Sequence, residues 1–289
     1  MQRKYNVAGF GEVLWDVYPE AKTLGGAPSN FAIHSKQLGA NSFLISCLGE
    51  DSLGKEAQRL LNDFGLDTSG MQVNKYFPTG RVLVNLDQMG NPSYKIDEES
   101  AWDYITFDEN MRNICQLLDS VCYGTLVQRN SNSKRTLIKI LESTPLNCLK
   151  VFDVNFRQEF YNKEIIKLSL EQADIVKMNE LEFYQITDII YFSQDWKKGA
   201  LSLIQEFDLK LVIITLGENG SIMATKNDYI IHTPENKVNV LSTVGAGDAY
   251  TASVVMGWLN QKPLNEIVLE ATNLASHVCG FMGAIPSQR

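Results

Sequence analysis

The stretch Ser242-Thr243-Val244-Gly245-Ala246-Gly247-Asp248-Ala249 carries the strongest fold signal in the chain. An apolar segment with helical spacing follows it, so we predict a helix over residues 243–259. Two glycines around an alanine allow a sharp turn in which successive N–H groups point the same way. The start of a helix adds unpaired N–H donors and the positive end of the helix dipole. The stretch therefore predicts an anion site, and phosphate is the anion that such sites usually bind.

Asp248 lies inside this predicted anion site, where a carboxylate repels phosphate unless it serves another purpose. One such purpose is to accept the proton of a hydroxyl group while its oxygen attacks phosphorus. The alternative is structural: a tight strand-to-helix turn with Asp248 placed favourably in the first helical turn. The chemical interpretation requires that residues 245–248 border a crevice and are not enclosed in the interior.

The composition is that of an ordinary globular protein of 289 residues, 44% of them hydrophobic and 21% charged. This length suits one large α/β domain or two small ones. The net charge of −8 argues against a nucleic-acid surface, which needs a basic stripe. Any polyanionic ligand must therefore be held by local donors and not by the overall field of the protein.

The cysteines and the first residues of the sequence indicate the cellular compartment of the protein. The five cysteines are odd in number and show no CxxC spacing, which indicates reduced thiols and not a disulfide framework or a zinc site. Residues 1–4 lead directly into a predicted strand without a signal peptide, and no apolar window has the length of a membrane span. We therefore expect a cytoplasmic protein with neither membrane nor nucleic-acid partners.

Strand and helix patterns alternate along most of the chain, which predicts a central, mostly parallel sheet covered by helices, in one domain over residues 1–289. The pattern breaks over residues 71–96, where alternating strands predict a small antiparallel sheet outside the main one. Such a sheet beside a ligand site often acts as a lid or a dimer contact, and we place lid segments around residues 12–28 and 71–105. Trp102, in the second segment, either covers a ligand or ties the lid to the body.

Polar residues follow several predicted strands, at the sheet edge where α/β proteins bind ligands. Asp16 lies in an apolar, aromatic setting and either contacts a ligand or caps a loop. In Gly25-Gly26-Ala27-Pro28-Ser29-Asn30, the glycines permit close backbone approach. Asn30 offers both a donor and an acceptor, which suits a neutral hydroxylated ligand. Arg157 either neutralises phosphate charge or pairs with a neighbouring acid.

Asn179 and Glu182 have the spacing of a capping box at the start of a helix. The alternative is that Glu182 holds waters of a phosphate-bound Mg²⁺, which takes few direct protein ligands. The sequence does not match two other nucleotide-binding signatures, the dinucleotide fingerprint and the P-loop. Gly9-Phe10-Gly11 is followed by Leu14 at the third glycine position and by no helix start, and no GxxxxGK[ST] is present, which excludes a P-loop enzyme.

Four motifs in this order make the chain resemble the ribokinase-like (PfkB) carbohydrate kinases along essentially its whole length. They are Gly25-Gly26-Ala27-Pro28-Ser29-Asn30, Asn179-x-x-Glu182, Thr215-Leu216-Gly217-x-x-Gly220 and Thr243-Val244-Gly245-Ala246-Gly247-Asp248. Within the family the chain is most similar to bacterial fructokinases, on Gly11-Glu12-Val13-Leu14-Trp15-Asp16 and Ala101-Trp102-Asp103. The resemblance implies a three-layer α/β/α fold with a small β-sheet lid. It also implies transfer of the γ-phosphoryl group of ATP to a sugar hydroxyl, with Mg²⁺.

The resemblance further implies residue roles. Asp248 matches the general base, and the amides of Gly245, Ala246 and Gly247 match the anion hole. The sugar-binding positions are Asp16, Gly25, Gly26, Asn30 and Arg157. The nucleotide-binding positions are Asn179, Thr215, Gly217, Gly220 and Asn273, and Glu182 matches the glutamate of the magnesium-associated motif.

Ser242 departs from the family pattern, which usually has an aspartate at this position near a monovalent-cation site. Activation by potassium is therefore in doubt, while the base and the anion hole are unaffected. We expect fructose as the acceptor. The alternatives are ribose, 2-keto-3-deoxygluconate or a nucleoside as acceptor, or a sugar or nucleotide sensor without catalysis, since fold alone does not guarantee chemistry. An uncovered lid strand also invites a homodimer.

Overall fold

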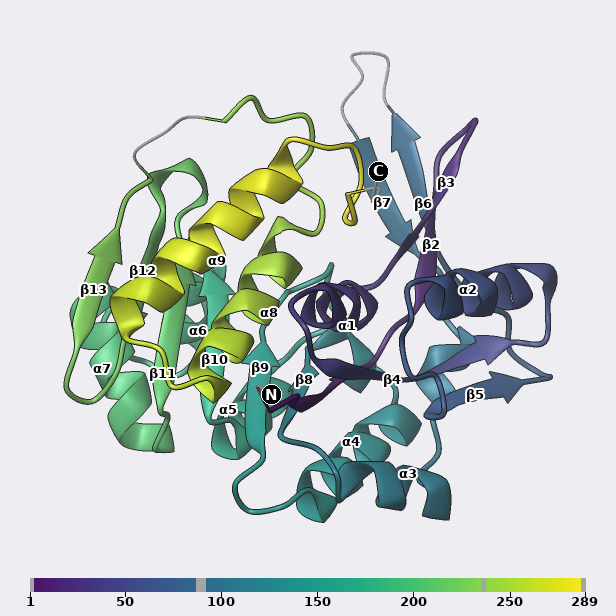
Figure 1. Cartoon of the computed structure of the whole chain (residues 1–289), viewed down its shortest axis with the longest axis horizontal. Coiled ribbons are helices and arrows are strands. Elements are labelled where there is room, and N and C mark those ends of the chain that lie inside the picture. Colours follow the sequence, from purple (N-terminus) through teal and green to yellow (C-terminus); the bar gives the residue numbers. More distant parts are fainter. Residues whose placement is uncertain (1–2, 87–91, 235–237, 287–289) are drawn as a thin grey trace.

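The structure is a computed structural model that describes residues 3–86, 92–234 and 238–286. In these residues, nine strands form a central sheet in the order β13-β12-β11-β10-β9-β8-β1-β4-β5 (Figure 1). The strands are β1 (Asn6–Phe10), β4 (Asn41–Gly49), β5 (Met71–Asn74), β8 (Ser120–Tyr123), β9 (Leu149–Asp153), β10 (Ile175–Asn179), β11 (Leu211–Thr215), β12 (Ser221–Ala224) and β13 (Tyr229–His232). The pairs from β5 to β11 are parallel, whereas β12 and β13 are antiparallel.

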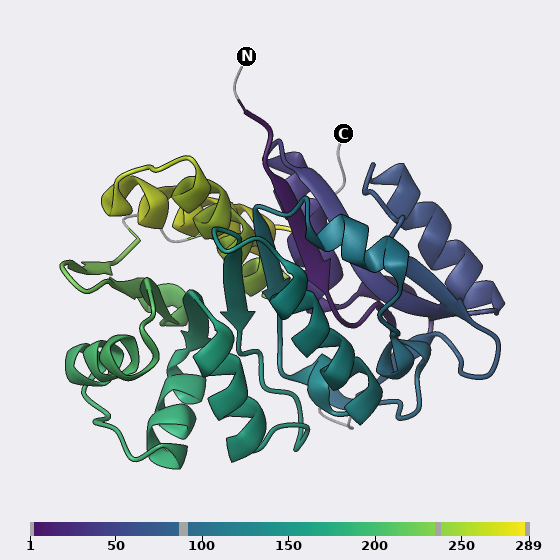
Figure 2. The ribbon, with the colours of Figure 1, turned by 90° about the horizontal axis from the view of Figure 1, so that it is seen from below.

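Helices cover both faces of this sheet, because successive strand residues point to opposite sides. In β11, Leu211 and Ile213 contact one hydrophobic core, and Val212 and Ile214 contact another. The first core is covered by helices α1 (Ala27–Gln37), α8 (Ala246–Leu259) and α9 (Leu264–Cys279), with α2 (Ser52–Asp63) beside α1. The second is covered by α3 (Glu109–Cys115), α4 (Ser131–Ser143), α5 (Lys163–Gln172), α6 (Glu180–Ile189) and α7 (Trp196–Phe207). Figure 2 shows the strands between these two helical layers, which confirms the predicted three-layer fold.

A second, four-stranded sheet stands apart at the upper right of Figure 1, in the order β3-β2-β6-β7. Its strands are β2 (Leu14–Val17), β3 (Lys22–Gly25), β6 (Gly80–Leu86) and β7 (Pro92–Ile96). Strands β6 and β7 pair antiparallel outside the main sheet, as predicted, but the observed arrangement differs from the prediction in two respects. Strand β5 joins the main sheet beside β4, and β2 pairs with β6 in parallel. Alternation along one strand does not reveal which neighbour it will pair with.

Trp102 ties the small sheet to the body, which was one of its two interpretations. It lies in the short helix η1 (Ala101–Tyr104), is fully buried, and packs in one cluster with Leu14, Val82 and Ile96 of the small sheet. Part of the second predicted lid segment, residues 87–91, lies outside the described residues. No helix in the described part of the chain is long and apolar enough to cross a bilayer.

Candidate active site

The phosphate turn, residues 243–248, leads into α8, which begins at Ala246 and not at residue 243 as predicted. The reason is Gly245, whose φ of 79° places it in the left-handed region and ends the possibility of earlier helical turns. A side chain at Gly245 would overlap Ala284 of the C-terminal segment. Residues 245–248 are half-buried, so the interior does not enclose them. Of the turn amides, that of Ala246 donates a long hydrogen bond of 3.3 Å to the carbonyl of Thr243.

Asp248 lies in the first turn of α8 and is held by a residue 218 positions away. The Nδ2 group of Asn30, in α1, donates a hydrogen bond of 2.8 Å to its Oδ2. Burial raises the pKa of Asp248 to about 6, and the negative charge of Asp153 adds to the rise. The hydrogen bond from Asn30 and the charges of Lys177 and Arg157 oppose it. A carboxyl group with this pKa is ionised at neutral pH and basic enough to accept a proton.

Gly25 and Gly26, just before α1, leave space for the side chain of Asp16 and the backbone of Glu12. An added Cβ at Gly25 would lie 2.7 Å from Oδ2 of Asp16, and a side chain at Gly26 would overlap the carbonyl of Glu12. The φ of 110° at Gly26 also excludes most other residues. Burial raises the pKa of Asp16 to about 6, against the attraction of Arg157. The structure thus brings Asp16, Gly25, Gly26 and Asn30 together around the start of α1.

Arg157 is exposed, and its guanidinium donates a long hydrogen bond of 3.4 Å to the carbonyl of Phe156. Its charge lowers the pKa of Glu12, Asp16 and Asp248, which places it among these three carboxyl groups. The alternative of a tight ion pair with a neighbouring acid is not seen among the described residues. Arg157 is therefore a charge at the mouth of the site.

Glu12 is a site residue that sequence reasoning missed. It is 3% exposed, and its Oε2 has no hydrogen-bond partner among the described residues. Burial raises the pKa of Glu12 to about 7, while backbone N–H groups of Glu12 and Ala27 and the charge of Arg157 oppose the rise. The charge of Asp248 raises this pKa further. The signal was available, because Glu12 closely follows a strand whose carboxyl end lies at the ligand edge of the sheet.

Lys177 is a second residue that the sequence prediction passed over. It lies in β10 between apolar neighbours, where a charged residue is rarely buried without a partner. Its Nζ lies 3.0 Å from Oδ1 of Asp153, the last residue of β9. Burial alone would lower the pKa of Lys177, but the carboxylates of Asp153, Glu182 and Asp248 raise it above its usual value. Lys177 is therefore a fixed positive charge behind the phosphate turn.

The predicted nucleotide side lies at the ends of β10 and β11, where Asn179 and Thr215 are register partners. Gly217 has open space around it and a φ of 60°. Gly220 is required structurally, because a side chain there would overlap the carbonyl of His232. Asn273 is exposed on α9, and no hydrogen bond among the described residues joins it to the other nucleotide positions.

Asn179 and Glu182 form the capping box that was one of the two interpretations. The side chain of Asn179 accepts a hydrogen bond of 2.9 Å from the N–H of Glu182, and Glu182 accepts one of 2.8 Å in return. The other carboxylate oxygen of Glu182 accepts from the N–H of Phe156 at 2.9 Å. Each carboxylate oxygen retains a second lone pair that suits a metal-bound water. No group of three or more His, Cys, Asp or Glu side chains in the described residues could hold a metal directly.

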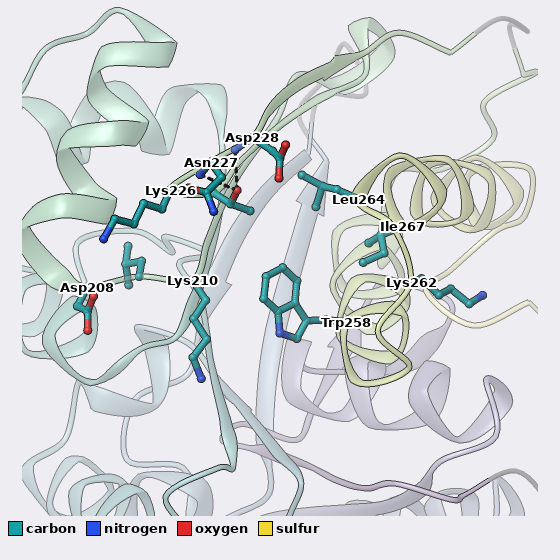
Figure 3. Close-up of a pocket in the computed structure, with 11 residues that line it drawn as sticks. Asp208, Lys210, Lys226, Asn227, Asp228, Trp258, Lys262, Leu264 and Ile267 are labelled. Atoms are coloured by element: carbon teal, nitrogen blue, oxygen red, sulfur yellow. Dashed lines mark hydrogen bonds between the residues drawn. The ribbon is translucent and has the colours of Figure 1, made fainter.

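A separate hollow of about 570 Å³ lies at the other end of α8 (Figure 3). It is lined by Trp258 of α8, Leu264 and Ile267 of α9, and residues beside β11 and β12. The side chains of Lys226 and Lys262 point away from Trp258. The hollow contains none of the predicted site residues, because Gly245 and Trp258 lie at opposite ends of the same helix.

Comparison with known proteins shows the family to which the chain belongs. Residues 4–289 match the model of the family described as pfkB family carbohydrate kinase. The chain is 31% identical to the putative sugar kinase PH1459 of Pyrococcus horikoshii, over 89% of this chain and 80% of that protein. It is 28% identical to a fructokinase of Salmonella typhimurium, over 96% and 95% of the two chains. The crystal structure of PH1459 in complex with ATP superposes with a TM-score of 0.81 at 27% identity, covering 98% of this chain and 94% of that one.

The chain therefore belongs to the pfkB family of carbohydrate kinases. Its fold is that of the ribokinase-like sugar kinases, and it is an ATP-binding phosphotransferase that acts on a carbohydrate.

Proposed function

We propose that this kinase transfers the γ-phosphoryl group of ATP to a hydroxymethyl group of fructose. The observation that carries the proposal is the position of Asp248. It lies in the first turn of α8, beside the amides of the phosphate turn, and is hydrogen-bonded to Asn30 of α1. One side chain thus borders both the predicted phosphate site and the predicted sugar site.

In the proposed reaction, Asp248 accepts the proton of the sugar hydroxyl while the oxygen of that hydroxyl attacks the γ-phosphorus and ADP leaves. Asn30 holds one carboxylate oxygen and so fixes the direction of the base. The amides of Gly245, Ala246 and Gly247, at the positive end of the α8 dipole, stabilise charge on the transferring group. Arg157 is exposed and able to move toward that charge.

Mg²⁺ fits the nucleotide side through Glu182, whose carboxylate suits a metal-bound water. When bound, the ion neutralises charge on the phosphates of ATP. Asn179, Thr215, Gly217, Gly220 and Asn273 are the residues that we assign to the nucleotide. Ser242 uses its Oγ to accept a hydrogen bond of 3.2 Å from the N–H of Val244, so it supports the phosphate turn where relatives have an acid near a monovalent cation.

The charge of the sugar site supports a neutral acceptor. Burial raises the pKa values of Glu12, Asp16 and Asp248, which means that three carboxyl groups lie together where water screens their charges poorly. A sugar acid or a sugar phosphate would add a further negative charge beside them. This argues against 2-keto-3-deoxygluconate, whereas ribose and nucleosides are neutral and must be compared directly.

A screen of ADP release, coupled to a spectroscopic assay, tests the proposal with fructose, glucose, mannose, ribose, 2-keto-3-deoxygluconate, fructose 6-phosphate and adenosine. We expect the highest kcat/KM with fructose. A higher value with an acidic or phosphorylated acceptor would overturn the substrate assignment. Binding of ATP without ADP release under any sugar would favour a sensor.

The small sheet is proposed to act as a lid, because β2 carries Asp16 and its neighbour β3 leads through Gly25 into α1. Closing it over the sugar would exclude water and so suppress hydrolysis of ATP. Strands β3 and β7 have free edges among the described residues, which suits a homodimer formed through the lid. Analytical ultracentrifugation with and without fructose measures this assembly.

A further inference from the structure

A buried ion pair lies directly behind the phosphate turn. The Nζ of Lys177 is 3.0 Å from Oδ1 and 3.4 Å from Oδ2 of Asp153, and the two side chains are 9% and 6% exposed. Charges removed from water are stable only with excellent partners, and an apolar pair of the same size often stabilises a fold equally well. The position of this pair therefore calls for a reason beyond stability.

The pair is joined to the phosphate turn at two points. An added Cβ at Gly247 would lie only 2.9 Å from Nζ of Lys177, so the ammonium group packs against the bare backbone of the turn. The Oγ1 of Thr251, one turn further along α8, lies 2.7 Å from Oδ2 of Asp153 and 2.9 Å from the carbonyl oxygen of Gly247. Movement of Lys177 or Asp153 would therefore move the turn.

We propose that Lys177, Asp153 and Thr251 form a positioning unit that holds the phosphate turn and keeps the neighbouring Asp248 carboxylate ready to accept a proton. The inference rests on the proposed role of Asp248 as the base. Lys177 supplies the positive charge, Asp153 fixes the ammonium group, and Thr251 connects both to α8. None of the three is proposed to touch the reacting atoms.

The charges around Asp248 explain how the unit acts. The titratable and charged groups that interact electrostatically with Asp248 are Glu12 after β1, Cys122 of β8, Asp153 of β9, Arg157 beyond β9 and Lys177 of β10. Burial raises the pKa of the Cys122 thiol, so this group is neutral. Removal of Lys177 would take away an attractive charge and leave Asp153 unneutralised. Both changes raise the pKa of Asp248.

The first test compares the pH dependence of kcat/KM in wild type and Lys177→Met. We expect the acid limb to move upward by about one pH unit or more, since one buried charge typically shifts a neighbouring pKa by this amount. In the double variant Lys177→Met/Asp153→Asn, both charges are absent, and the limb should return most of the way to the wild-type position. An unchanged limb in folded Lys177→Met would overturn the proposal.

The matched control is a second well-buried ion pair, between Arg129 and Asp103, which lies beneath the small sheet. Its atoms approach to 2.7 Å, and its side chains are 6% and 2% exposed. Arg129→Met should lower the thermal unfolding midpoint as Lys177→Met does, without moving the acid limb. An equal shift of the limb in Arg129→Met would show that general loosening causes it, and would also overturn the proposal.

A readout without substrate separates this inference from the proposed function. Titration of the Asp248 carboxyl carbon by NMR, assigned with Asp248→Asn, should show a higher pKa in Lys177→Met than in wild type. If Lys177→Met does not fold, Lys177→Gln keeps a hydrogen bond to Asp153 and removes the charge. A shifted titration in a protein that phosphorylates no sugar would leave the positioning unit intact and reject only the kinase assignment. No shift in either variant would reject the unit itself.

Discussion

At the scale of single residues, the ionised form of Asp248 is needed for the proposed reaction but lowers the stability of the fold. Burial and the charge of Asp153 raise its pKa to about 6, so the ionised form is disfavoured in the fold, yet that same form is the proposed base. Natural active sites commonly accept a loss of stability of this kind in exchange for reactivity. Substitution of Asp248 should therefore change both the rate of the reaction and the thermal stability of the protein.

We predict that Asp248→Asn lowers kcat by about 10²–10⁴-fold, the usual contribution of a general base, and leaves the Kd for ATP nearly unchanged. In wild type, kcat/KM should fall as the pH drops through about 6, because the base becomes protonated. The folded pKa is higher than the unfolded value of 3.8, so the ionised carboxylate destabilises the fold above about pH 6. Asp248→Asn should therefore unfold at a higher temperature than wild type at pH 8, and the difference should vanish near pH 4. Wild-type turnover in this variant would remove Asp248 from the mechanism.

Glu12 gives a second prediction at the same scale. Its folded pKa of about 7 lies above the ordinary 4.5, so ionised Glu12 destabilises the fold at pH 8, and protonated Glu12 does not at low pH. We expect Glu12→Gln to raise the free energy of unfolding at pH 8 by roughly 2–3 kcal/mol, with the gain disappearing as the pH falls below about 5. It should also reduce discrimination against 2-keto-3-deoxygluconate. The exposed Glu142→Gln serves as control and should change neither property.

At the scale of elements, α6 begins with side chains that serve two purposes. Asn179 and Glu182 cap its first turn, and the same residues are assigned to the nucleotide and to metal-bound water. A helix cap alone would explain their spacing. Helix α7 offers a comparison, because Asp195 caps it by accepting a hydrogen bond from the N–H of Lys198, outside the proposed site.

We predict that Asn179→Ala and Asp195→Ala each lower the free energy of unfolding by about 1 kcal/mol, the usual cost of losing a helix cap. Only Asn179→Ala should raise the KM for ATP. Glu182→Gln should raise the Mg²⁺ concentration needed for half-maximal rate, because the charge beside the proposed metal-bound water is lost. These are measured by urea unfolding and by steady-state kinetics. Equal kinetic effects in Asp195→Ala would show that Asn179 and Glu182 only cap the helix.

At the scale of the whole molecule, the beginning and the end of the chain meet at the site. Asn30 reaches Asp248 from α1, and His34, one turn later, makes a 3.0 Å hydrogen bond between its Nε2 and the carbonyl of Ala284. Ala284 in turn packs against Gly245 of the phosphate turn. Burial lowers the pKa of His34, so it is neutral at physiological pH. Helix α1 thus holds both the base and the segment behind the turn.

We predict that His34→Ala lowers the thermal unfolding midpoint by several degrees and reduces kcat, because the C-terminal segment no longer supports the phosphate turn. Gln37→Ala is the matched control: it removes the partner at Nδ1, which lies 3.2 Å away on the exposed side of α1, and keeps the bond to Ala284. Differential scanning calorimetry and initial rates distinguish the two. A Gln37→Ala variant as impaired as His34→Ala would contradict this role for the C-terminal segment.

The sequence by itself determined the elements and the motifs. The alternating strand and helix patterns predict a central, mostly parallel sheet covered by helices, which the structure confirms. Local periodicity is enough for this, because each buried strand or amphipathic helix carries its own pattern. The glycine turn likewise predicts an anion site from the sequence alone, since N–H groups at a helix start are a local property.

Only the tertiary structure decided what is brought together. Strand β5 joined the main sheet and β2 paired in parallel with β6, because pairing depends on distant partners that no single strand encodes. Lys177 was missed for the same reason, because its importance comes from Asp153 and Asp248. The place of Glu12 after β1 was a local signal, but its interaction with Asp248 depends on the tertiary structure. The pKa of a carboxyl group, and so its ability to act as a base, depends on the groups packed around it. The tertiary structure decides which groups those are.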